Sequence, residues 1–154
     1  MKVLFVCSGN VFRSLSAEAC FNHYVKINGL SHSALSAGSR VVSQPIHPAV
    51  IGELNNHGII VEHQPRSVCK ELISDCDLVL AMGLDHQSFL KERFGVKALL
   101  FNELVNGKKE SIPDHYEVLF ENNLYGDEII SYIRGVVRYI HNSIPLLIKS
   151  LVSQ

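Results

Sequence analysis

The hydrophobic pattern of this chain alternates between short apolar runs and longer stretches with helical spacing. A strand that is covered on both faces of a sheet reads as a continuous apolar segment. Residues 2–6 and 77–82 fit that description and are predicted to be strands, and we predict two further strands at residues 33–36 and 96–101.

Between these runs, apolar residues recur at spacings of three and four, which is typical of helices with one buried face. The alternation of strands and helices predicts an α/β fold, an open parallel sheet with helices on both faces. The 154 residues suit a single domain, residues 1–154. The predicted helices cover residues 14–28, with Ser14 as a candidate cap, and 47–57, 67–74, 85–94 and 126 to the end, where Pro145 favours a kink.

The segment 103–124 has no clear periodicity and contains Pro113. A stretch of that length between regular elements is commonly a functional loop or a partly disordered one. We therefore expect it to contribute to a site.

Composition narrows the class of partner. The chain is 47% hydrophobic and 19% charged with a formal net charge of −1, which does not favour a nucleic acid or a membrane as partner. No leader peptide or run of about 20 apolar residues is visible. The four cysteines (Cys7, Cys20, Cys69 and Cys76) read as free thiols of a reducing compartment, and we expect a cytoplasmic protein.

The first strand leads into the stretch "CSGNVFR". Ligands of open α/β sheets bind beyond the carboxyl ends of strands, and a loop that enters a helix directs backbone N–H groups at an anion. Gly9 allows close backbone approach and Asn10 tolerates a left-handed conformation. This cradle favours a thiolate at Cys7, and Arg13 can grip two oxygens of a bound anion. The loop thus predicts a site for phosphate or sulfate-like anions with a nucleophile at its base.

Several motifs resemble those of one family. "VCSGNVFRS" is similar to the signature V-C-x-G-N-x-C-R-S-P of the low molecular weight protein tyrosine phosphatases, and "LSAGS", "CDLVLAM" and "IPDHY" are similar to further motifs of that family. The resemblance covers nearly the whole chain. It implies a four-stranded parallel sheet in the order 2-1-3-4.

The resemblance also implies a function, a phosphotyrosine protein phosphatase that hydrolyses phosphate monoesters through a cysteinyl-phosphate. Cys7 would be the nucleophile, Arg13 the phosphate clamp and Asp114 the general acid and base. No metal or organic cofactor would be needed, and the partner would be a phosphotyrosine-containing protein, with a tyrosine kinase among the candidates. The implied substrate-binding residues are Ser8, Gly9, Asn10, Val11, Phe12, Ser14 and Tyr116.

The chain departs from the family pattern at a few positions. Phe12 replaces a second cysteine that can trap the nucleophile as a disulfide, and Leu15 replaces a proline. His115 stands where the family has proline after the acid, so we expect a more mobile Asp114 and slower catalysis. Val11 is the residue type of the tyrosine enzymes, because related phosphoarginine phosphatases tend to have threonine there.

Three alternative functions stay open. A phosphotyrosine-binding protein with weak catalysis would use the cradle for recognition alone. A thioredoxin-coupled arsenate reductase would link Cys7 to Cys69 or Cys76 during turnover. A phosphoarginine phosphatase would differ in substrate preference only. Metal binding is not favoured, because the eight histidines show no ligand spacing.

Overall fold

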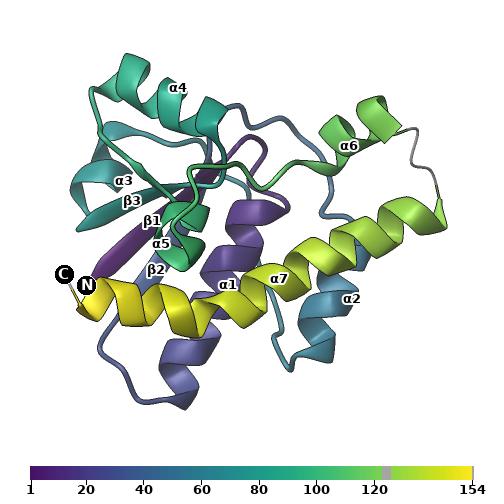
Figure 1. Cartoon of the computed structure of the whole chain (residues 1–154), viewed down its shortest axis with the longest axis horizontal. Helices are drawn as coiled ribbons and strands as arrows, with labels where there is room; N and C mark the ends of the chain where they lie inside the picture. Colours follow the sequence, from purple (N-terminus) through teal and green to yellow (C-terminus); the bar gives the residue numbers. More distant parts are fainter. Residues whose placement is uncertain (123–125, 154) are drawn as a thin grey trace.

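The computed structural model describes residues 1–122 and 126–153 and contains one parallel sheet (Figure 1). Its strand order, β2-β1-β3-β4, confirms both the predicted α/β class and the order 2-1-3-4. Cys7 at the end of β1 lies beside Gly38 at the end of β2. The strands are β1 (Lys2–Cys7), β2 (Ser33–Gly38), β3 (Leu78–Ala81) and β4 (Leu99–Leu100).

Helices cover both faces of the sheet. Successive side chains of β1 point to opposite faces, so Phe5 and Cys7 join a core with α1, α5 and α7, while Leu4 and Val6 join a second core with α3 and α4. Helix α2 packs on α7. The helices are α1 (Arg13–Ile27), α2 (Pro48–Asn56), α3 (Lys70–Ser74), α4 (Leu84–Phe94), α5 (Phe101–Asn106), α6 (His115–Asn122) and α7 (Asp127–Val152).

Helix α7 crosses in front of α1 in Figure 1 and supplies much of the first core. Its buried positions follow the predicted spacing, with Ile133, Val137, Ile140 and Ile144 all at most 1% exposed. The helix runs without interruption through Pro145. Among the described helices, including this one, none is long and apolar enough to cross a membrane.

Two predictions about the middle of the chain were wrong. The strand predicted at 96–101 contains only Leu99 and Leu100, because the amide of Leu100 is capped by the carboxylate of Glu103 (3.5 Å) and α5 begins at Phe101. The apolar run there reflects burial rather than strand length. The segment 103–124 is not one loop, since it contains most of α5 and all of α6; residues 123 and 124 lie outside the described residues.

Candidate active site

Residues 8–12 form the loop between the end of β1 and the start of α1. In the described part of the chain, the backbone N–H groups of these five residues donate to no protein acceptor. Gly38 of the "LSAGS" motif permits this path, because a Cβ atom at that position would lie 2.5 Å from the carbonyl oxygen of Ser8. A run of free N–H groups at a helix N-terminus is an anion-binding arrangement.

Asn10 holds this loop in shape. It is fully buried and has a φ of 57°, the left-handed conformation predicted for it. Its side-chain amide donates to the hydroxyls of Ser14 (3.0 Å) and Ser36 (2.8 Å), and its Oδ1 accepts from the amide of Arg66 (3.0 Å). Nε2 of His63 lies 2.8 Å from its carbonyl oxygen. These bonds offset the backbone strain of a non-glycine residue with positive φ.

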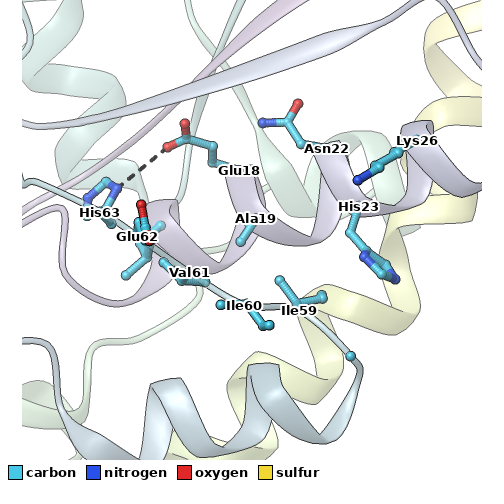
Figure 2. Close-up of a pocket in the computed structure, with 12 residues that line it drawn as sticks. Glu18, Ala19, Asn22, His23, Lys26, Ile59, Ile60, Val61, Glu62 and His63 are labelled. Atoms are coloured by element: carbon cyan, nitrogen blue, oxygen red, sulfur yellow. Dashed lines mark ion pairs between the residues drawn. The ribbon is translucent and has the colours of Figure 1, made fainter.

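A cavity of about 440 Å³ lies between α1 and residues 58–63. Figure 2 shows Glu18 and His63 at one end of it, joined as an ion pair with 4.0 Å between Oε2 and Nδ1. Oε2 of Glu18 also accepts a hydrogen bond from Ser36. Through Ser36 and His63, this end of the cavity contacts the network that holds Asn10.

Cys7 is buried at the base of the loop, with 2.9 Å between its Sγ and the Oγ of Ser14. Ser14 was predicted to cap α1, and this was wrong. The helix begins at Arg13 and has no side-chain cap, so the Ser14 hydroxyl is available to the thiol. A hydroxyl at this distance can donate a hydrogen bond to a thiolate.

Arg13 connects the loop to the segment before α6. Its side chain is 2% exposed, and NH1 donates to the carbonyl oxygen of Ile112 (2.8 Å) while NH2 lies 3.0 Å from Oδ2 of Asp114. Its buried Nε has no acceptor among the described residues. A buried donor without a partner is costly, and an anion in the loop would satisfy it.

Asp114 lies at the N-terminus of α6 and caps it. Its Oδ1 accepts from the amide of Tyr116 (3.2 Å), and its own amide donates to the carboxylate of Glu117. Burial on its own would raise the pKa of Asp114. The contact with His115 and the positive charge of Arg13 outweigh burial and lower that pKa to about 2.

The predicted residues meet at one cavity of about 890 Å³. Asn10 and Ser14 are buried beneath it rather than in its wall. In the described residues no three His, Cys, Asp or Glu side chains could hold a metal ion. Of the predicted residues, the cavity is lined by Cys7, Ser8, Gly9, Val11, Phe12, Arg13, Asp114 and Tyr116.

Sequence reasoning missed His86 as a contact of the loop. His86 lies in the first turn of α4, is 1% exposed, and has its Nε2 2.9 Å from the hydroxyl of Ser8. Burial and the charge of Arg13 lower the pKa of His86 to about 4. The signal that could have identified it is its position in the sequence. His86 follows three residues after "LAMG" at the end of the third strand, on the same edge of the sheet as Cys7.

The other three cysteines, Cys20, Cys69 and Cys76, do not line this cavity. Cys76 precedes β3 at the opposite edge of the sheet, where the amide of Asp77 donates to the carbonyl of Lys2. Since a disulfide needs Cα atoms within about 7 Å, this placement argues against a Cys7–Cys76 pair. Burial raises the pKa of the Cys20 thiol to about 12.

The comparisons with known proteins agree with this geometry. Residues 2–151 match the family model described as low molecular weight phosphotyrosine protein phosphatase. A protein-arginine-phosphatase of Bacillus subtilis is 32% identical, over 75% of this chain and 80% of the relative. A low molecular weight protein-tyrosine-phosphatase of Streptomyces coelicolor is 31% identical, over 75% of this chain and 77% of the relative.

A solved structure agrees as well. The crystal structure of a YwlE mutant from Bacillus subtilis has a TM-score of 0.83 and 27% identity, over 98% of both chains. With the family model covering nearly the whole chain, this protein belongs to the low molecular weight phosphotyrosine protein phosphatase family.

Proposed function

We propose that this protein is a phosphotyrosine protein phosphatase that works through a cysteinyl-phosphate. One observation carries the proposal: Cys7, Arg13 and Asp114 line the same cavity, next to the free N–H groups of residues 8–12. A thiol nucleophile, a cationic clamp and a carboxylate are the groups that phosphate-monoester hydrolysis requires.

In the first step, the thiolate of Cys7 attacks phosphorus, and the bond to the leaving phenol oxygen breaks. The loop N–H groups and Arg13 stabilise the charge on the equatorial oxygens. Ser14, 2.9 Å from the sulfur, stabilises the thiolate when it leaves in the second step.

Asp114 would protonate the leaving phenolate and then take a proton from the attacking water. In the ligand-free protein its carboxylate is paired with Arg13 at 3.0 Å. A bound phosphate dianion competes for the guanidinium, so substrate binding weakens this pair. Loss of the positive partner raises the affinity of Asp114 for a proton.

The lining of the cavity favours an aromatic substrate. Val11, Val42 and Ile46 line it with apolar side chains, and the exposed ring of Tyr116 is positioned to stack on a phenyl group. Val11 has no polar group to bind a guanidinium, and it is the residue type of the tyrosine enzymes.

Phosphoarginine is the second candidate substrate. The arginine-phosphatase relative is as similar as the tyrosine-phosphatase relative, at 32% and 31% identity. The carboxylates of Asp85 and Glu117 also line the cavity, and a guanidinium leaving group is attracted by such charges.

The test is steady-state hydrolysis of a phosphotyrosine peptide and a phosphoarginine peptide of the same sequence. We expect the wild type to have the higher kcat/KM for the phosphotyrosine peptide and Cys7→Ser to be inactive on both peptides. Asp114→Asn should lose about 10²-fold or more in kcat on the phosphotyrosine peptide. Val11→Thr is the matched variant and should shift the ratio of kcat/KM toward phosphoarginine. A wild type that prefers phosphoarginine overturns the substrate proposal, and one that binds phosphate without turnover overturns the enzymatic one.

A further inference from the structure

Two positions at which this chain departs from the family pattern lie in contact with each other. Phe12, in the phosphate-binding loop, and His115, after Asp114, meet edge-on with ring centroids 5.7 Å apart and planes at 66°. Phe12 is 3% exposed, so the contact is anchored in the core. The side chain of His115 therefore packs against the loop.

The imidazole of His115 also contacts the carboxylate of Asp114. Nδ1 of His115 lies 3.1 Å from Oδ1 of Asp114, and the side chain of His115 is 15% exposed. This Nδ1 is buried and has no other partner among the described residues. Oδ2 of the same carboxylate faces Arg13, so Asp114 is held between two groups.

This arrangement bears on how Asp114 obtains a proton. With a pKa of about 2, the carboxyl group is ionised at neutral pH in the ligand-free protein. A general acid must be protonated when the leaving group departs. Imidazole is the side chain type that exchanges protons between pH 5 and 8, and one is in contact with the carboxylate.

We propose that His115 is a positioning residue that also holds the proton used by Asp114, so that the pair, rather than the carboxyl group alone, protonates the leaving group. The proposal rests on the proposed function, because it assigns the proton source for that reaction.

The pair would move one proton in each of the two steps. As the bond from phosphorus to the leaving oxygen breaks, Nδ1 of the His115 imidazolium gives its proton to the carboxylate of Asp114, which passes one proton on to that oxygen. This leaves a neutral imidazole and a carboxylate. In the second step, the carboxylate takes a proton from the attacking water, and Nδ1 of His115 accepts it. One turnover thus restores the imidazolium and consumes no further reactant.

The groups around His115 allow this cycle. The imidazole of His47, before α2, has its centroid 6.3 Å away, and burial followed by the neighbouring charge of His115 lowers the pKa of His47. The ring of Tyr116 lies 4.1 Å away on the same element. The other titratable groups near the pair are Arg13 from α1, His86 from α4, Glu117 from α6 and Tyr132 from α7, whose hydroxyl donates to the carbonyl of Pro113.

The experiment measures kcat against pH for two substrates. Phenyl phosphate has a poor leaving group that must be protonated by the general acid, whereas the leaving group of p-nitrophenyl phosphate needs little protonation. His115→Gln keeps a polar side chain that does not titrate, and His115→Phe keeps the packing on Phe12. Phosphate inhibition constants show that each variant retains the folded loop. We expect both variants to lose about tenfold on phenyl phosphate and to change the pH dependence of kcat, while kcat for p-nitrophenyl phosphate changes less than twofold.

Two results would overturn the proposal. One is a pH profile of His115→Gln that coincides with the wild type. The other is an equal loss on both substrates at every pH, which would indicate a purely structural role. A wild type that hydrolyses neither ester would instead overturn the proposed function and the relay with it, so the two failures are distinguishable.

Discussion

Asn10 shows how one residue can determine the shape of a catalytic loop. Its backbone is left-handed at φ 57°, and its side chain is the donor to Ser14 and Ser36. Asparagine combines the two properties, since it enters this region more readily than most residues and carries an amide. This was predictable from "SGN" because the preference is local, whereas the partners were not, because Ser36 and Arg66 are distant in sequence.

The first prediction separates these two roles of Asn10. Asn10→Gly loses the side-chain hydrogen bonds but adopts positive φ freely. Asn10→Ala loses the same hydrogen bonds and also disfavours positive φ. We expect the free energy of unfolding to fall by about 1–3 kcal/mol in the glycine variant and by about 1 kcal/mol more in the alanine variant. Denaturant titration measures both. An alanine variant as stable as the glycine variant would show that the backbone carries no strain.

At the scale of elements, the predictable parts were those specified by local pattern. β1 is a continuous apolar run and α7 has a regular apolar stripe, so both were found with small errors at their ends. α6 was missed because a helix of 8 residues is too short to show a repeated apolar stripe in the sequence. The signal was instead Asp114-x-x-Glu117, a capping box of the type that starts helices.

This cap gives a second prediction. Glu117→Ala removes the acceptor of the Asp114 amide and should destabilise the start of α6 by about 1 kcal/mol. We expect faster hydrogen exchange of α6 amides and a lower kcat on a phosphotyrosine peptide. The control is Glu128→Ala, an exposed residue of α7 with the same change of charge. Equal exchange rates in the two variants would show that the capping box does not stabilise α6.

At the scale of the whole molecule, one prediction concerns stability against pH. His86 is buried with a pKa of about 4, against an ordinary value of 6.5, because burial opposes its charge. The unfolded chain therefore binds more protons between these values, and stability falls as the pH decreases from about 6.5 to 4. The loss attributable to His86 is at most about 3 kcal/mol.

Thermal unfolding of wild type and His86→Gln from pH 7.5 to 4 tests this. Glutamine can still bond to the hydroxyl of Ser8 but does not titrate. We expect the unfolding temperature of the wild type to fall more steeply than that of the variant over this range. Parallel curves would mean that His86 is not the group responsible.

The fold follows from patterns along the chain, and the site follows from how the fold joins distant segments. Cys7 and Arg13 were predictable together because one loop carries both. Their meeting with Asp114, and the contact of His86 with Ser8, depend on the order of strands in the sheet. Local spacing carries no information on such contacts.

The central claim is that Cys7 carries the phosphoryl group during turnover. The most direct measurement is mass spectrometry of acid-quenched protein after mixing with p-nitrophenyl phosphate, using Asp114→Asn to slow the second step and Cys7→Ala as the control. We predict one added phosphoryl group on the peptide that contains Cys7, and none in the control. Turnover without a modified Cys7, or with the group on another residue, would contradict the account.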